Sequence, residues 1–234
     1  MQNLTILENY LKEKNLYSEE ILRKFGDYFL LLEDWNKKIN LTAITSLEDV
    51  QIKHFIDSLL GNDLIQGSLS VCDIGCGAGF PSIPLAILNP NIEFTLVDSV
   101  NKKIEFIKEV KKELSLDNIT TLHSRVEDFA KENFQKFDIC VARAVAALPT
   151  LAEYTLPLVK VGGKLIAYKG INYKEELENS NKILCILNSK VQEIREYSLV
   201  GGDKRFIIIV EKDGDCPKKY PRGGNKPRIS PILG

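Results

Sequence analysis

The chain has 234 residues, of which 44% are hydrophobic and 27% charged, and its formal net charge is −1. This composition suits one large domain, or one domain with an extension, around a sizeable core. No apolar run approaches the roughly 20 residues of a membrane span, and the N-terminal sequence "MQNLTILENYLKEK" lacks the pattern of a secretion signal. We therefore expect a cytoplasmic protein with no membrane partner.

The cysteines give no sign of a metal site. There are five, an odd number, and no pair has the C-x-x-C spacing of a zinc site. Cys72 and Cys76 are four residues apart, with no second pair or histidine nearby. We expect reduced thiols and no bound metal.

Residues 1–66 are predicted to form a helical extension. Between Ile21 and Ile39, apolar residues recur at steps of three and four. Ser18, followed by two glutamates, is a typical helix cap, and a second helix is predicted after Ser46. Trp35 lies on the apolar stripe, so we interpret it as a core residue.

From residue 67 to 211, apolar β-branched segments alternate with helical ones. Predicted strands cover 69–74, 93–98, 119–122, 136–142, 163–169, 191–198 and 205–211, and predicted helices about 82–88, 100–114, 127–133, 148–159 and 174–187. This alternation indicates an α/β fold with a mostly parallel seven-stranded sheet covered on both faces. Only "VGGDK" separates the last two strands, which should form an antiparallel hairpin.

The segment "DIGCGAGF" joins the first predicted strand to the first helix after it. Gly75, Gly77 and Gly79 have no Cβ, so this turn can adopt positive φ and approach a ligand closely. Ligands of open parallel sheets bind at the carboxyl ends of the strands. Asp98 ends the next predicted strand, where an acid can accept hydrogen bonds from a ribose diol.

Two cofactors, NAD and S-adenosylmethionine, fit these features. The dinucleotide fingerprint needs a third glycine where this chain has Phe80, followed directly by Pro81. Together with Asp98 and the terminal hairpin, "DIGCGAGF" instead resembles motif I of the class I S-adenosylmethionine-dependent methyltransferases. That resemblance implies a Rossmann-like fold and S-adenosylmethionine as cofactor.

The fourth predicted strand, "FDICVARAVAAL", bears on the methyl acceptor. It lacks the acidic or amide residue, prolines and aromatic of enzymes that methylate exocyclic amines. Cys140 lies inside the strand, so we interpret it as core and not as a nucleophile. The acceptor should then already be nucleophilic, as a purine N7 is. Arg143, at the strand end, could position cofactor, phosphate or a guanine edge.

Nearly the whole chain resembles one family, the small-subunit ribosomal RNA guanine-N7 methyltransferases (RsmG, also GidB). The resemblance rests on segments that include "WNKKINLTAI", "HFIDSL", "DIGCGAGFPSIPLAI", "ARAVAAL" and "YPRGGNKPRISPIL". It implies methyl transfer to guanine 527 of 16S rRNA, in the 530 loop, with free 16S rRNA or the 30S ribosomal subunit as partner.

The resemblance also assigns residues. It implies that Gly75, Phe80, Val126, Glu127 and Arg143 contact the cofactor and that Asp98 is the motif acid. Family positions also match Asn36, Asn40, His54, Asp57 and Lys169, of which we assign Lys169 to the substrate. His54 is equally well explained as a core histidine.

Residues 212–234 form a basic segment rich in proline and glycine. We expect an extended surface arm whose Arg222, Lys226 and Arg228 reach RNA phosphates, because this composition disfavours a helix or central strand. The alternative is that the arm folds back and its arginines pair with acids of residues 1–211.

Two other functions remain open. The chain would be a non-catalytic RNA-binding protein if the cofactor pocket were only a structural support. It would be a small-molecule methyltransferase if the basic tail were incidental. We expect a monomer.

Overall fold

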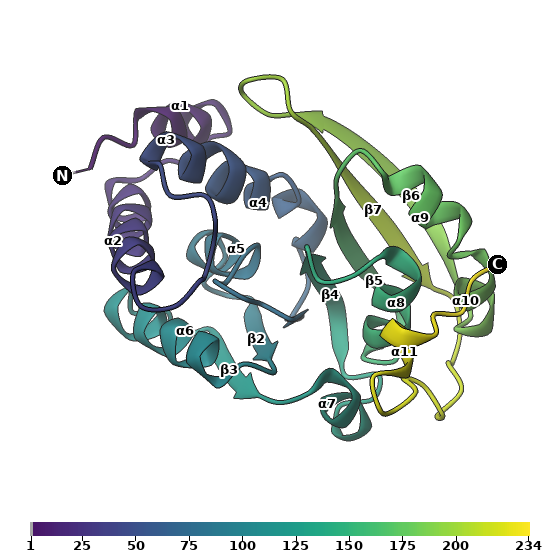
Figure 1. Ribbon diagram of the computed structural model, residues 1–234. Helices are drawn as coiled ribbons and strands as arrows, with labels where there is room; N and C mark the ends of the chain where they lie inside the picture. Colours follow the sequence, from purple (N-terminus) through teal and green to yellow (C-terminus); the bar gives the residue numbers. More distant parts are fainter. Residues whose placement is uncertain (1) are drawn as a thin grey trace.

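The computed structural model describes residues 2–234. Within that range, seven strands form one mixed sheet in the order β3-β2-β1-β4-β5-β7-β6 (Figure 1). Their bounds are β1 Ser70–Ile74, β2 Glu93–Asp98, β3 Ile119–His123, β4 Phe137–Arg143, β5 Val159–Lys169, β6 Ser189–Ser198 and β7 Lys204–Lys212. Neighbours from β3 to β5 run parallel, whereas β7 is antiparallel to β5 and β6. The predicted α/β sheet with its terminal hairpin is confirmed.

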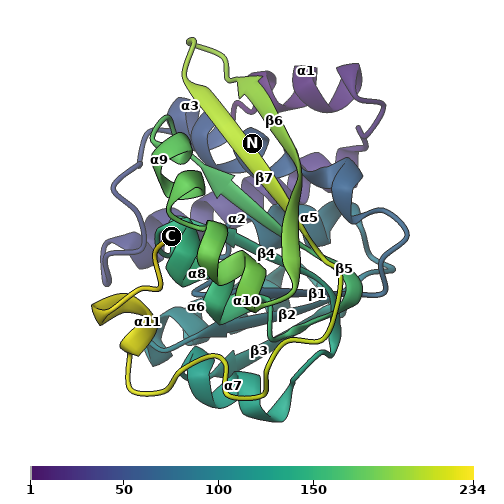
Figure 2. The same ribbon diagram turned by 90° about the vertical axis from the view of Figure 1, so that its right-hand side faces the viewer.

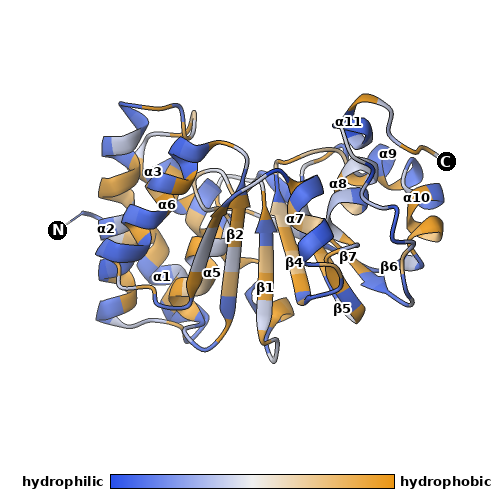
Figure 3. Ribbon diagram, turned by 90° about the horizontal axis from the view of Figure 1, so that it is seen from below, coloured by the Kyte–Doolittle hydropathy of each residue, from blue (hydrophilic) through white to orange (hydrophobic). Residues whose placement is uncertain are grey.

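Helices cover both faces of this sheet. In β7, Ile207 and Ile209 pack on one face, and Ile208 and Val210 pack on the other. Figure 3 shows the largely hydrophobic strands between the two layers. One layer holds α1 Thr5–Glu13, α2 Glu19–Asn36, α5 Ser82–Leu88 and α6 Asn101–Glu113, and the other holds α7 Val126–Glu132, α8 Leu148–Thr155, α9 Tyr173–Glu178 and α10 Asn181–Ile186.

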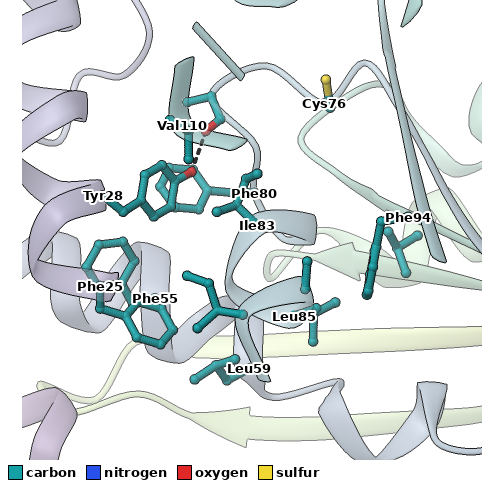
Figure 4. Close-up of a cluster of buried hydrophobic side chains, with 14 of the residues drawn as sticks. Phe25, Tyr28, Phe55, Leu59, Cys76, Phe80, Ile83, Leu85, Phe94 and Val110 are labelled. Atoms are coloured by element: carbon teal, nitrogen blue, oxygen red, sulfur yellow. Dashed lines mark hydrogen bonds between the residues drawn. The ribbon is translucent and has the colours of Figure 1, made fainter. Parts of the chain in front are cut away.

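The N-terminal helices share a hydrophobic cluster with the sheet. Tyr28 of α2 packs with its ring centroid 5.5 Å from that of Phe55 and 5.4 Å from that of Phe80 (Figure 4). The Ser18 hydroxyl accepts the Ile21 N–H at 3.1 Å, so the predicted cap is present. Trp35 packs on Phe106 at 5.6 Å, as its interpretation as a core residue requires.

A widened helical turn lies in the helix predicted after Ser46. The helix runs as α3 Leu47–Val50, π-helical η1 Gln51–Ile56 and α4 Asp57–Leu59, followed by the 3₁₀ turn η2 Asn62–Ile65. The Ser46 hydroxyl accepts the Asp49 N–H at 3.1 Å and caps this helix, which confirms the predicted helix start. π-helical turns are frequent at functional sites, and this one carries His54.

Two predicted boundaries are wrong. The helix predicted over 148–159 ends at Thr155, and β5 begins at Val159, because Pro157 cannot donate a helical N–H and Val159 pairs with Phe137. A Cβ on Gly163 would collide with the Asp138 carbonyl, so this glycine lets β5 approach β4. The helix predicted over 174–187 is two helices, α9 and α10.

The C-terminal segment does not extend from the surface, so the arm prediction is wrong and the folded-back alternative is correct. After β7 it returns along α8 (Figure 2), where Tyr220, Pro221 and Pro227 are buried. It also contains a short helix, α11 Lys226–Ile229, which the prolines were expected to exclude. Pro227 lies in the first turn of α11, where its missing N–H has no helical acceptor to lose.

Within residues 2–234, no helix is both long enough and apolar enough to cross a membrane. The same range contains no cluster of histidine, cysteine and acidic side chains that could hold a metal ion.

Candidate active site

Two neighbouring cavities open at the carboxyl ends of the strands. The β1–β2 cavity, about 200 Å³, is lined by residues that include Gly75, Asp98, Val126 and Glu127. The β4–β5 cavity, about 510 Å³, is lined by residues that include Lys53, His54, Asp57, Arg143, Lys169 and Arg205. The sheet order reverses between β1 and β4, and such a switch point is where ligands of this architecture bind.

The glycine turn has the predicted backbone. Gly75, Gly77 and Gly79 have φ of +68°, +57° and +92°, values that favour glycine. Gly75 borders the β1–β2 cavity, and a Cβ there would meet Val145 at 3.2 Å. Gly79 has another job, because a Cβ on it would collide with Ile83 and Ile107. Gly77 and Gly79 do not line the cavity, and Gly79 serves helix packing.

Asp98 holds this turn from the end of β2. Its carboxylate accepts the Gly77 N–H at 3.0 Å and the Val100 N–H at 2.9 Å. The residue is 5% exposed and lines the β1–β2 cavity. An ionised carboxylate has about four lone-pair sites, so Asp98 keeps the capacity to accept further hydrogen bonds from a ligand.

The opposite wall of the β1–β2 cavity starts α7. Val126 and Glu127 are the first residues of that helix, and the Glu127 side chain accepts the Asn225 N–H at 3.2 Å. Asn225 and Arg228 of the C-terminal segment line the same cavity. The sequence analysis assigns Arg228 to RNA phosphates and does not single out Asn225, because it predicts a free arm.

A second acid, Asp73, lies under the glycine turn. It is 1% exposed and accepts the Ser82 hydroxyl at 2.6 Å. Burial raises the pKa of Asp73 to about 8, against the opposing effect of the Ser82 hydrogen bond. Burial thus favours the neutral form of Asp73.

Arg143 lies at the end of β4, as predicted, but in the β4–β5 cavity. It donates to Asp57 Oδ2 at 2.8 Å and to the Lys53 carbonyl at 2.9 Å. Its guanidinium lies 5.0 Å from the ring centroid of Phe80. Phe80, which is expected to contact the cofactor, does not line the β1–β2 cavity. Its ring instead packs against the Arg143 guanidinium.

His54, another neighbour of Arg143, stacks on Phe80, and the two ring centroids lie 4.3 Å apart. The Arg143 guanidinium lies 3.0 Å and the Lys53 carbonyl 3.1 Å from His54 Nδ1. Arginine only donates and makes the shorter of the two contacts, so we assign Nδ1 as the acceptor and place the proton on Nε2. Burial and the Arg143 charge lower the pKa of His54 to about 3. His54 is thus a neutral, positioned side chain.

The polar chain continues from His54 into the N-terminal helices. His54 Nε2 donates to Thr42 Oγ1 at 2.7 Å. Asn36 accepts the Leu41 and Thr42 N–H groups at 2.9 and 3.0 Å and donates to the Thr42 carbonyl. Asn36 therefore holds the loop that orients His54, a role that spacing did not reveal.

Lys169 also lines the β4–β5 cavity, but its charge is paired. Its ammonium donates to Glu176 at 2.6 Å and to the Ala146 carbonyl at 2.8 Å. Asp57, 4% exposed, is flanked by Arg143 and Arg205; burial raises its pKa, against the effect of both arginines. Both cavities therefore contain charges held by partners within the fold.

Val145 separates the two cavities and lines both. It follows Ala144, whose φ of +58° makes the chain turn sharply after β4. The Val145 carbonyl accepts from Arg228 at 2.9 Å. Two ligands, one bound in each cavity, would therefore lie on either side of Val145.

The three residues of the C-terminal segment that are expected to bind RNA lie in different environments. The Arg222 side chain is 25% exposed and pairs with Glu153 at 2.7 Å. Arg228 is exposed but bonded to Val145. Lys226 is exposed at the start of α11.

A doubly wound sheet closed by an antiparallel pair, with a positive-φ glycine turn and an acid at the end of β2, defines a class I S-adenosylmethionine-dependent methyltransferase. The solved O-methyltransferase from Bacillus cereus in complex with SAH has the same fold, with a TM-score of 0.59 and 15% identity over 88% of this chain and 97% of that chain. The predicted fold class is confirmed.

The chain belongs to the rRNA small subunit methyltransferase G (GidB) family, whose model matches residues 21–205. The ribosomal RNA small subunit methyltransferase G of Streptococcus pyogenes serotype M2 (strain MGAS10270) is 45% identical over 228 residues, 94% of this chain and 95% of the relative. That of Streptococcus sanguinis (strain SK36) is 47% identical over 216 residues, 89% of this chain and 90% of the relative. The predicted family is confirmed, and with it the methyltransferase activity and the cofactor.

Proposed function

We propose that this chain transfers a methyl group from S-adenosylmethionine to N7 of guanine 527 in the 530 loop of 16S rRNA. One observation carries the proposal: the β1–β2 cavity, with its acids and glycine turn, meets the cation-lined β4–β5 cavity at Val145. We assign the first cavity to the cofactor and the second to the guanine.

The residues of the β1–β2 cavity suit the cofactor. Asp98 has lone pairs free for ribose hydroxyls, and the backbone around Val126 and Glu127 would hold the adenine. Gly75 leaves the turn open where a side chain would meet Val145. When bound, the cofactor supplies a methyl group on a positively charged sulfur.

The β4–β5 cavity suits an acceptor that is already nucleophilic. Cys140 is fully buried in β4, with its Sγ 3.7 Å from the Thr155 carbonyl, so it cannot attack a ring carbon. His54 accepts from Arg143 and has no free nitrogen with which to act as a base. A purine N7 has a free lone pair and needs only correct placement.

Arg143 is our candidate for that placement. Its bonds to Asp57, the Lys53 carbonyl and His54 occupy three of the five N–H groups of a guanidinium. The remaining N–H groups would donate to the guanine O6, which leaves N7 uncovered. Positioning by a side chain that is itself held by hydrogen bonds fits a reaction without proton abstraction.

The test is methyl transfer from labelled cofactor, with unmodified 30S particles and free 16S rRNA as separate substrates, followed by mapping of the modified base. Label at N7 of guanine 527 is the expected result. Label on another base would overturn the assignment, and label on small molecules alone would favour a small-molecule methyltransferase. No transfer despite RNA binding would favour the non-catalytic RNA-binding function.

A further inference from the structure

A buried ion pair fastens the C-terminal segment to α8. Glu153 is 1% exposed, and its carboxylate accepts from Arg222 Nε at 2.8 Å, from Arg222 Nη2 at 2.7 Å and from the Arg222 backbone N–H at 2.9 Å. Two parallel side-chain bonds of this kind are the strong, geometrically specific form of the arginine–carboxylate pair. Within residues 2–234, the Glu153 carboxylate accepts no hydrogen bond other than these three.

Breaking the Arg222–Glu153 ion pair is energetically costly. A carboxylate buried without its partner keeps its desolvation penalty, so Glu153 disfavours any arrangement in which the segment leaves. Apolar contacts support the same placement, because Tyr220 and Pro227 belong to the buried residues. Thr150 of α8 also donates to the Pro227 carbonyl at 2.8 Å. The segment is therefore held on both sides of Asn225.

Between these anchors, the segment reaches the β1–β2 cavity. Asn225 has a φ of +61° and directs its N–H to Glu127, while Tyr154 donates to its side-chain oxygen at 3.3 Å. Arg228 donates to the carbonyl of Val145, the residue between the two cavities. The Asn225 bond engages one oxygen of Glu127, and the other oxygen has no partner among the recorded bonds of residues 2–234.

We propose that residues 222–228 are part of the cofactor site. The Arg222–Glu153 pair docks the segment, Asn225 orients the Glu127 carboxylate, and Arg228 holds Val145 in place. Arg222, Asn225 and Arg228 are thus positioning residues for the cofactor and not phosphate contacts. The inference rests on the proposed function, because it takes the β1–β2 cavity as the place where the cofactor binds.

Calorimetric titration of the full chain with S-adenosylhomocysteine tests this. Arg222→Ala should weaken binding by at least about tenfold, which corresponds to about 1.4 kcal/mol. Arg228→Ala, at an exposed position, should also weaken binding. Lys218→Ala is the matched control, because Lys218 is an exposed cation of the same segment outside the cavity. Wild-type affinity in both arginine variants would overturn the inference.

Hydrogen exchange of the wild-type chain separates this inference from the proposed function. S-adenosylhomocysteine should slow exchange at residues 74–77 and 98–100, and also at 225–228. Protection of the first two segments without the third would overturn the inference and leave the cofactor placement standing. Absence of protection at 74–77 and 98–100, despite binding, would overturn the placement itself.

Discussion

The glycine turn and the C-terminal segment border the same cavity but are held by different kinds of contact. The turn is pinned by near neighbours in the sheet: Gly75 donates to the Val97 carbonyl at 2.7 Å, and Gly77 to Asp98 at 3.0 Å. The segment is pinned by Glu153 and Glu127, which lie 69 and 98 residues away along the chain. Local backbone chemistry thus shapes one wall, and long-range charge pairing shapes the other.

The largest expected effect is on the long-range wall. Arg222→Ala leaves Glu153 without its partner, and loss of one member of a buried pair costs about 3–5 kcal/mol of the free energy of unfolding. We expect the low end, about 3 kcal/mol, because Arg222 is 25% exposed. Urea unfolding measures it, with Lys218→Ala as control. An unchanged midpoint would mean that the segment is not docked in solution.

The next effect concerns the local wall. Asp98→Ala removes the acceptor for the Gly77 N–H and for the proposed ribose hydroxyls. Each hydrogen bond to a charged group contributes about 1.5–3 kcal/mol, so at the low end of that range two lost ribose bonds correspond to about a hundredfold weaker binding of S-adenosylhomocysteine. Calorimetry measures it, and circular dichroism checks the fold. Wild-type affinity in the folded variant would remove Asp98 from the site.

A third effect, on pH dependence, concerns the β4–β5 cavity on the other side of Val145. His54, stacked on Phe80 beside the glycine turn, has its pKa lowered from 6.5 to about 3. A lowered folded-state pKa means that stability is present above pH 6.5 and is lost as the pH falls towards 3. From this shift, His54 contributes a loss of about 2 kcal/mol of unfolding free energy between pH 7 and pH 5, whereas the raised pKa of Asp73 contributes a gain over the same range.

His54→Gln is the matched variant for this measurement, because glutamine keeps an acceptor for Arg143 and does not titrate. Urea unfolding at both pH values should show a change in unfolding free energy that is about 2 kcal/mol less favourable in the wild type than in the variant. Equal changes in the two proteins would show that His54 is not held neutral.

The smallest effect tests what remains of RNA binding by the segment. Lys226 is exposed, unlike Arg222, whose charge is paired. If it contacts a phosphate, Lys226→Ala should reduce the log–log salt slope of 16S rRNA binding by about 0.7–0.9. An unchanged slope would assign RNA binding to other surfaces.

Much of the fold followed from local pattern. The strands of the sheet, the Ser18 cap, the helix start after Ser46 and the positive φ of the glycine turn are all predicted, because each depends on residues within a few positions. The errors lie where distant segments meet. The strand predicted over 163–169 begins at Val159, where contact with Asp138 makes Gly163 part of a continuous strand.

Within the site, the sequence pointed to Gly75, Asp98, Val126 and Glu127, and these residues do line one cavity. It did not reveal that Phe80 supports Arg143, or that Lys169 is paired with Glu176. Spacing along a strand shows where a residue lies, but a charge partner comes from another element. Such partners are invisible until the elements are packed.

The sequence by itself determined the family, through the motif segments that resemble it. It also determined the order of strands and helices and the backbone of the turn, since these depend on periodicity, capping and glycine conformation. Only the tertiary structure decided the fate of the basic C-terminal segment. An arginine in a proline- and glycine-rich stretch indicates solvent exposure when read alone. Glu153, buried in α8 without another recorded partner in residues 2–234, reverses that expectation, because a desolvated carboxylate requires a cation beside it.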